Sequence, residues 1–499
     1  MKLPNTFYNP ISYLGSIIAL IAWITLIFFV ILIFFFNINN VYFDLYTFIV
    51  TPIFLVIGHI LIPIGMYRKR KRIKKGIQIS DDKLFVLNLK DSKTRNAVLI
   101  FSVISIFFIV STIVGSYKAF HYTESVEFCG KLCHKVMNPE YTAYQNSPHA
   151  KVKCAECHVG EGADFYVKSK MSGLRQVFKY TLGTYIRPIA TPIENLRPAR
   201  ETCEKCHWPQ KFYTNSLRRE KYYLADSANT EWNITLNMKI GADHQAMGLT
   251  EGIHWHINPD INIEYKSSPK RDIIYWIKKT DLKTGKEVIY KDSEVDMKTV
   301  DLKSSEARSM DCMDCHNRPS HEYHSPSKYV NDLMAGQNGI SSIPWFKSAA
   351  MEALKISYGT SDSAATEIKN KIVNFYKETY PDFYKQYNKQ IIKAISDVKT
   401  AYSKNAFPEM KVNYSVYPRH IGHLESNGCF RCHNDRFKSP EGKVISKDCN
   451  LCHTIVAQGK TGDIKYTGIN STLEFSHPVD IGDAWKESNC MDCHSQLYQ

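Results

Sequence analysis

The sequence predicts a membrane-anchored protein of mainly helical and irregular structure, in which three transmembrane helices precede a large domain that contains a small β-rich insert. Three observations predict this fold class. Long apolar stretches occupy the first part of the 499-residue chain. Cysteine pairs, each followed at once by histidine, recur through the rest of the chain. One region between them is rich in β-branched and aromatic residues.

The first apolar stretch, Leu14–Phe36, has no formal charge. As a helix of about 35 Å it is long enough to cross a bilayer. It lacks the small-residue cleavage site of a signal peptide, so we expect it to remain as an anchor. A second span is expected from Val41 to Tyr67, with kinks at Pro52 and Pro63, and a third from Ala97 to Ser116.

The loop after the second span fixes the predicted orientation. Arg68–Lys75 (RKRKRIKK) holds seven cations, and such clusters stay on the cytoplasmic side. The amino terminus is then inside, the turn at Asn37–Asn40 is outside, and the chain from Phe120 onward is outside. His59 lies within the second span, where a titratable side chain is either functional or held in a hydrogen bond between helices.

Seven cysteine motifs use all 14 cysteines of the chain. The first lies in Phe128–Met137 (FCGKLCHKVM) and has three residues between its cysteines, whereas the other six have two. Two thiols on a short loop with an imidazole directly after them are what covalent haem c requires. Zinc sites do not need histidine after every second cysteine, and no cysteine remains for a disulfide elsewhere. The cysteines are Cys129, Cys133, Cys154, Cys157, Cys203, Cys206, Cys312, Cys315, Cys429, Cys432, Cys449, Cys452, Cys490 and Cys493.

The motifs therefore predict a multihaem cytochrome c with seven covalently bound haem c groups and five regions. Residues 1–119 form the membrane anchor, 120–215 a three-haem domain, and 216–311 the β-rich insert. Residues 312–415 hold the fourth haem and a helical spacer, and 416–499 form a second three-haem domain. Because haems crowd the two three-haem domains, we expect the porphyrins to supply most of their buried surface.

Local patterns place the insert and the spacer. Strands are expected at Asn233–Ile240, Ile261–Tyr265 and Ile273–Ile277, with a hairpin turn at Lys283–Lys286 before Glu287–Tyr290. Helical spacing of apolar residues predicts helices between Trp345 and Asn405.

Each haem iron takes one axial ligand from its motif and needs a second to become a low-spin electron carrier. The motif ligands are His134, His158, His207, His316, His433, His453 and His494. Met137 is a candidate ligand of the first haem, where a thioether raises the reduction potential, although methionine also fills gaps in protein cores. For the other six haems we favour His149, His254, His256, His321, His423 and His477, with His121, His244, His324 and His420 in reserve.

The net charge of +14 does not indicate a nucleic-acid partner. Residues 68–96 alone carry +8 (11 basic minus 3 acidic), and the chain from Phe120 onward carries about +5. Two propionates on each of seven haems would make the large domain near neutral or acidic. Its Lys and Arg residues are better explained as propionate partners and docking charges.

The transmembrane helix that leads into the first motif, its nearby Met137 and the segment Ser147–Gly160 (SPHAKVKCAECHVG) resemble the NapC/NirT family of membrane-anchored quinol dehydrogenases. The resemblance covers about Ala97–Tyr213. The whole chain resembles the enlarged inner-membrane cytochromes of that family that serve metal-reducing respiration. This implies menaquinol oxidation at the outer surface of the membrane and electron transfer to periplasmic c-type cytochromes or a terminal reductase. It also implies that Met137 and His149 are haem ligands and that Lys168 or Lys170 lies near the quinol.

The chemistry of the substrate leads to the same function. A quinol is lipid-soluble and releases two electrons and two protons, so it must meet a haem at the membrane edge, with proton acceptors nearby. Glu124, Glu127 and Asp164 lie close in sequence to the first two motifs, although they could equally be ordinary surface carboxylates. Lys168 and Lys170 could instead pair with propionates. Two other functions remain open: a multihaem oxyanion reductase with an open haem iron, and a passive electron-transfer subunit of a larger membrane complex.

Overall fold

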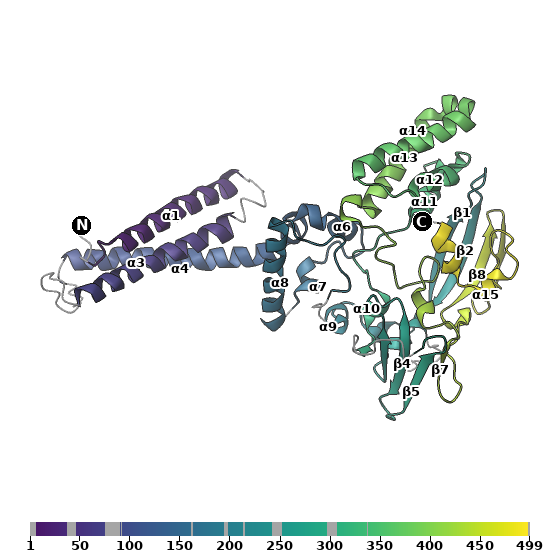
Figure 1. The fold of residues 1–499 in the computed structure, drawn as a ribbon, viewed down its shortest axis with the longest axis horizontal. Coiled ribbons are helices and arrows are strands. Elements are labelled where there is room, and N and C mark those ends of the chain that lie inside the picture. Colours follow the sequence, from purple (N-terminus) through teal and green to yellow (C-terminus); the bar gives the residue numbers. More distant parts are fainter. Residues whose placement is uncertain are drawn as a thin grey trace. The chain divides into compact units, whose positions relative to one another are not determined.

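The computed structural model describes most of the chain as two compact units (Figure 1). The described residues are 6–36, 46–74, 90, 92–160, 163–193, 198–212, 215–241, 252–296, 307–336 and 338–497. The first unit comprises Met1–Met137 with Lys153–Ala155, and the second comprises Asn138–Val152 with Glu156–Gln499.

Long helices build the described part of the first unit. They are α1 (Pro10–Phe36), α3 (Thr51–Ile73), which follows the π-helical turn η1 (Tyr46–Val50), and α4 (Ser92–Thr123). Helices α1 and α3 pack closely through small residues, since a Cβ added at Gly58 would lie 2.7 Å from the backbone nitrogen of Ala19. The Ser12 hydroxyl donates to the Ile62 carbonyl across the same contact, at 2.9 Å. Small residues that let two backbones approach are typical of helix packing in membranes.

Within the described residues, two helical segments are long and apolar enough to cross a membrane, Pro10–Phe29 and Thr51–Ile73. They overlap the first two predicted spans, whereas Asn37–Asn40 and residues 41–45 lie outside the described residues. Pro52 begins α3 instead of kinking it, because the first turn of a helix does not need the missing N–H. The third predicted span falls within α4, and its crossing of the membrane stays a prediction.

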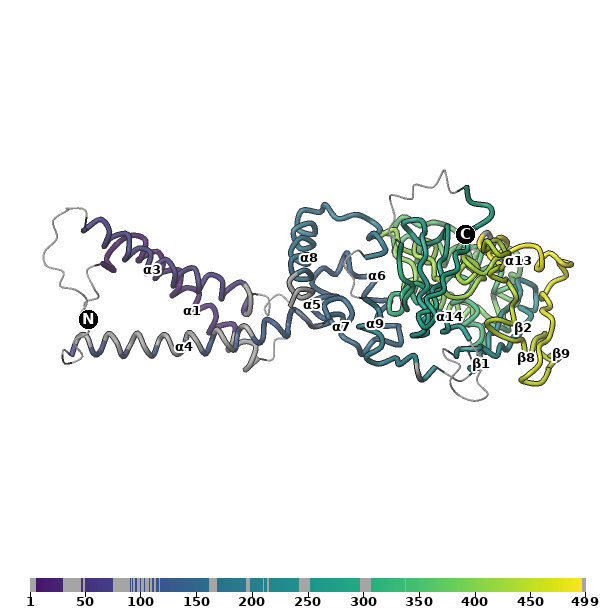
Figure 2. Tube along the Cα trace, turned by 90° about the horizontal axis from the view of Figure 1, so that it is seen from below, coloured from purple at the N-terminus to yellow at the C-terminus, as the bar shows by residue number. Residues whose placement is uncertain are grey.

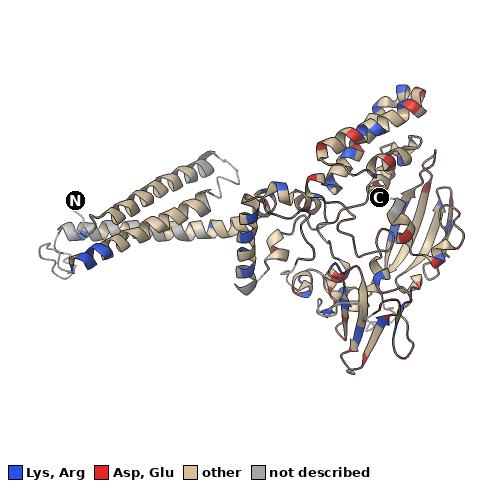
Figure 3. Ribbon diagram, viewed as in Figure 1, with Lys and Arg blue, Asp and Glu red and all other residues tan. Residues whose placement is uncertain are grey.

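Cations gather at the end of α3 (Figure 3). Arg70, Lys71 and Arg72 lie in its last turn, where positive charge interacts favourably with the helix dipole. These residues begin the basic loop on which the predicted orientation depends.

Short helices carry the cysteine motifs. They are α5 (Val126–Lys131), α7 (Cys154–His158), α9 (Ala199–Cys203), α10 (Cys312–Cys315), η6 (Gly428–Arg431), η7 (Cys449–Leu451) and α16 (Cys490–Leu497). Two longer helices, α6 (His134–Gln145) and α8 (Ala163–Thr181), follow the first two motifs. The remaining short helices are η2 (Pro209–Lys211), η3 (Ile253–Ile257), η4 (Ile340–Ser342), η5 (Pro408–Met410) and α15 (Ala484–Glu487).

The largest apolar core of the second unit lies among four helices of the spacer. These helices are α11 (Pro326–Ala335), α12 (Phe346–Leu354), α13 (Ser361–Thr379) and α14 (Pro381–Asn405). Ile368, Ile372 and Tyr376 of α13 are fully buried against Ile391 and Ile395 of α14. The helical periodicity predicted between Trp345 and Asn405 is therefore confirmed.

Two antiparallel sheets contain the strands of the second unit, and Figure 2 labels β1, β2, β8 and β9 in one region of that unit. The first has the order β1 (Asn215–Tyr223), β2 (Glu231–Lys239), β8 (His453–Lys460) and β9 (Asp463–Tyr466). The second has the order β6 (Arg308–Ser309), β3 (Ile261–Ser267), β4 (Ile274–Asp281), β5 (Glu287–Asp292) and β7 (Phe437–Lys438). The predicted hairpin turn at Lys283–Lys286 joins β4 and β5 and is confirmed.

The fold is a mixture of helix and sheet, so the predicted fold class is confirmed in part: β1–β6 lie in or at the edge of the predicted insert, but the sheets extend beyond it. Strands β7 and β8 belong to the chain after residue 416 and complete both sheets. Met238 of β2 pairs with His453, the motif histidine that begins β8. Local alternation along the insert does not reveal partners that lie more than 200 residues away.

Candidate functional site

Six histidine pairs stand out in the second unit. In each pair the histidine of a motif faces one of the six histidines favoured as second ligands. The distances between ring centroids are 6.1 Å for His158 and His321, 6.1 Å for His207 and His149, 6.3 Å for His316 and His254, 5.7 Å for His433 and His256, 6.2 Å for His453 and His423, and 6.1 Å for His494 and His477.

This spacing fits one metal ion between two imidazoles. A bond from a metal to an imidazole nitrogen is about 2 Å long and the ring centre lies about 1 Å beyond that nitrogen, so ligands on opposite sides of one ion have ring centres roughly 6 Å apart. All 14 cysteines are free thiols in the structure. No group of three or more Cys, His, Asp or Glu side chains converges as a zinc site would, within the part of the chain that the structure describes. The donor set therefore fits haem c better than zinc.

Backbone carbonyls orient most of the histidines favoured as second ligands. The Nδ1–H of His254 donates to Ile240 at 2.7 Å, and that of His256 donates to Ile253 at 2.7 Å. His149, His321 and His477 donate in the same way to Pro319, Glu140 and Val479, at 3.2, 3.0 and 2.9 Å. A proton held on Nδ1 leaves the Nε2 lone pair available for a metal and fixes the plane of the ring.

Burial keeps several of these imidazoles neutral, as metal binding requires. Loss of solvent lowers the pKa of His158, His256 and His433 below the ordinary value. It lowers the pKa of His423 to about 4, with a further contribution from the nearby His453. The Nδ1 atoms of His423 and His453 are both buried without a hydrogen-bond partner, so no hydrogen bond at Nδ1 fixes the tautomer of this pair.

The first motif differs from the other six. His134 and Met137 are three residues apart in α6, so both side chains project from one face of this helix. Cys129 and Cys154 are hydrogen-bonded within the first unit, and this bond lowers the pKa of Cys154 to about 7. The first and second motifs therefore meet at their leading cysteines.

Sequence reasoning missed a buried charge cluster at the fourth motif. The Asp314 carboxylate, 2 % exposed, accepts hydrogen bonds from Arg308 Nε at 2.8 Å, the Tyr265 hydroxyl at 2.5 Å and Arg271 Nη1 at 3.3 Å. The guanidinium of Arg431, inside the fifth motif, donates to the Asp314 carbonyl at 2.7 Å. A charged residue between the two cysteines of a motif is the only sequence signal that could have drawn attention to these contacts.

A second missed contact holds a ligand loop in place. Glu140 of α6 accepts hydrogen bonds from Arg318 at 3.2 Å, and its carboxylate lies 3.1 Å from His321 Nδ1. Arg318 also donates to the His321 carbonyl at 2.7 Å. These bonds fasten the His321 loop to the helix that follows the first motif.

The residues predicted to serve the quinol are divided between the units. Glu127 is exposed on α5 of the first unit, and Glu124 is half-buried just before it. Lys168 is exposed and Lys170 half-buried on α8 of the second unit. Asp164 lies in the first turn of α8, and its side chain lies outside the described residues.

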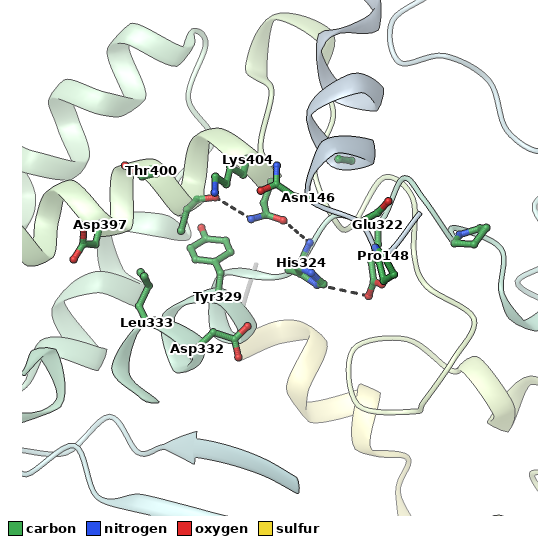
Figure 4. A pocket seen from close by; sticks show the side chains of 15 residues that line it. Asn146, Pro148, Glu322, His324, Tyr329, Asp332, Leu333, Asp397, Thr400 and Lys404 are labelled. Carbon is green, nitrogen blue, oxygen red and sulfur yellow. Dashed lines mark hydrogen bonds and ion pairs between the residues drawn. The ribbon is translucent and has the colours of Figure 1, made fainter. Parts of the chain in front are cut away.

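The other histidines have different surroundings. His420 is buried, and its Nδ1–H donates to the Asp314 carbonyl at 3.2 Å. His324 lies in a cavity of about 410 Å³, where its backbone N–H donates to Asn405 at 2.8 Å and its ring lies 3.6 Å from Glu322 (Figure 4). His121 contacts Tyr117 at the end of α4, and His244 lies outside the described residues. The Nδ1–H of His59 donates to the Leu55 carbonyl of its own helix at 2.8 Å.

Comparison with known proteins identifies the family. Residues 91–188 match the model of the NapC/NirT cytochrome c family, N-terminal region. The chain is 40 % identical to cytochrome c-type protein ImcH of Geobacter sulfurreducens over 493 residues, which cover 99 % of this chain and 96 % of that protein. It is 34 % identical to cytochrome c-type protein NrfH of Wolinella succinogenes over 98 residues, or 19 % of this chain and 55 % of that protein. No solved structure matches. The chain therefore belongs to the NapC/NirT cytochrome c family of membrane-anchored multihaem electron-transport proteins.

Proposed function

We propose that this protein oxidises menaquinol at the outer surface of the cytoplasmic membrane and passes the electrons through seven haem c groups to periplasmic redox partners. The six histidine pairs are the observation that carries the proposal. Each pair gives one metal ion two axial ligands, which is the coordination of an electron carrier and not of an open catalytic iron. When bound, each haem accepts and releases a single electron.

The chain supplies the ligands of these groups. Cysteines of the seven motifs hold the porphyrins covalently, and the six pairs provide axial imidazoles through their free Nε2 atoms. At the first motif, His134 or Met137 would hold the haem iron, since both side chains project from one face of α6.

Helix α8 provides an apolar surface suited to a lipid-soluble substrate. Met171, Leu174 and Phe178 are each more than 60 % exposed along one side of this helix. Lys168 and Arg175 flank that side. Such a surface suits the boundary between lipid headgroups and acyl chains, where a quinol would approach the protein. In this proposal Lys168 or Lys170 positions the quinol, and Glu127 or Asp164 takes up its protons.

The membrane arrangement belongs to the same proposal. Helices α1, α3 and α4 cross the cytoplasmic membrane, the basic cluster that begins at Arg68 stays inside, and the motifs lie on the periplasmic side. At the six sites with paired histidines an oxyanion reductase is disfavoured, because such an enzyme needs an accessible iron to bind its substrate. A passive subunit would accept electrons from a partner protein instead of from a quinol.

Reduction of the purified full-length protein by a menaquinol analogue tests the proposal. We expect reduction of all seven haems under anaerobic conditions in detergent or vesicles, and a lower rate in Leu174→Glu and Phe178→Glu. Leu217→Glu changes a leucine on β1 that is 52 % exposed and should keep the wild-type rate. Protein that resists the quinol but is reduced by another redox protein would support the passive-subunit function instead.

A further inference from the structure

The motifs make a series of contacts that follows their order in the chain. Cys154, which begins the second motif, lies in the same compact unit as the first motif. The second and third sites are linked by their second ligands, since His149 donates to the carbonyl of Pro319, two residues before His321. The third and fourth meet where α9, which ends at Cys203, packs against α10, which begins at Cys312.

The fourth and fifth sites share one element. Helix η3 carries both of their second ligands, so that the ring of His254 faces His316 while the ring of His256, two residues on, faces His433. Arg431 of the fifth motif joins the motif loops directly. It donates to Asp314 of the fourth motif at 2.7 Å and to the Arg271 carbonyl at 2.7 Å.

The last three sites continue the series. Phe430 of the fifth motif stacks on His423, the second ligand of the sixth site, with a centroid distance of 4.4 Å. The Nδ1–H of His433 donates to Ser446, three residues before the sixth motif, at 3.0 Å. The ammonium of Lys447 then donates to Ser488, two residues before the seventh motif, at 3.3 Å.

We propose that the seven haem sites form one unbranched series in chain order, that electrons leave at Cys490–His494, and that Arg431 positions the fourth and fifth sites for transfer between them. This rests on the proposed function, because the quinol is the two-electron donor at the first site. Each transfer within the series moves one electron and no proton, and an external one-electron oxidant takes the electron from the seventh site. Arg431 touches protein groups only, so it acts as a positioning residue.

The arrangement gives the added C-terminal region a definite role. The match to the family model ends at residue 188, just before the third motif. The later motifs extend the series instead of forming a second entrance, because each contact between motifs named above joins neighbours in the chain. In this arrangement the junction at Arg431 is the route by which electrons from the quinol reach the last three haems.

Two variants test the proposal, and haem content by the pyridine haemochrome assay accompanies both. If Arg431→Gln retains seven haems, we expect the quinol to reduce the first four haems rapidly and the last three about ten-fold or more slowly. Small displacements at a reacting site have effects of at least this size. Arg436→Gln is the matched control. Arg436 pairs with Asp292 and Glu294 at 2.8 and 2.7 Å, outside the motif loops, and the control should show a single reduction phase.

The second variant combines Cys490→Ala with Cys493→Ala and removes the seventh haem. It tests the series even if the Arg431→Gln protein fails to assemble. We expect six haems that are still reduced by the quinol, a loss of most electron transfer to ferricytochrome c, and a changed EPR signal from one neighbouring haem only. Unchanged transfer to ferricytochrome c, or changed signals from several haems, would overturn the single series. If dithionite reduces the wild-type protein but the quinol does not, the proposed function is refuted. The EPR comparison would then still decide the order of the sites.

Discussion

Replacement of Asp314 by Asn should destabilise the second unit through the loss of one buried charge. The substitution keeps the shape of the side chain but leaves the guanidinium groups of Arg308 and Arg271 without their shared carboxylate. Breaking a buried ion pair costs about 3–5 kcal/mol. Because the Arg308 and Arg271 side chains remain 33 % and 23 % exposed, solvent recovers part of this loss, and we expect about 2–3 kcal/mol.

Urea unfolding followed by circular dichroism measures this effect as a shift of the midpoint to lower denaturant. Asp332→Asn is the control, because Asp332 is 55 % exposed and pairs with Lys328 in the same helix. Removal of such a pair should cost about 0.5 kcal/mol or less. Equal midpoints for Asp314→Asn and the wild type would refute the conclusion that this carboxylate holds the fourth motif in place.

Further predictions concern pH, ligand assignment and packing. Burial lowers the pKa of Lys347 from 10.5 to about 7, so between these pH values the unfolded chain binds a proton that the folded chain does not. The free energy of unfolding should therefore rise with pH across this window, by up to about 1.4 kcal/mol per pH unit. In thermal melts at several pH values, Lys347→Met should lose that rise. His423→Ala should convert one haem to a high-spin form that binds carbon monoxide, whereas His420→Ala should not, as absorption spectra will show. Ile368→Ala should cost about 2–5 kcal/mol in urea unfolding because it opens a cavity in a fully buried core, and Ile392→Ala, 38 % exposed, about 0.5 kcal/mol or less.

Local patterns in the sequence were enough to predict the spacer helices and the hairpin. Ile368, Ile372 and Tyr376 recur at helical intervals because one side of α13 faces the core, and that periodicity is visible in the sequence. The turn at Lys283–Lys286 contains glycine with a positive φ of 70° at Gly285, which side chains other than glycine rarely adopt.

Long-range pairing could not be predicted in the same way. Strand β8 begins at the motif residue His453 and pairs with β2, and neither segment indicates the other. The cluster around Asp314 joins residues from three separate strands and loops, so its charges look like ordinary surface charges in the sequence. The six second ligands could be favoured from local context, but which motif each one faces depends on the folded chain, as for His321 beside His158.

The number of haem irons with two histidine ligands tests the central claim most directly. Near-infrared magnetic circular dichroism of the fully oxidised protein separates iron with two imidazoles from iron with methionine or an open position. We predict six irons with two histidine ligands and one, at Cys129–His134, with a different coordination. Fewer than six, or a count that does not change when His423 is replaced by Ala, would contradict the assignment of the paired histidines as haem ligands.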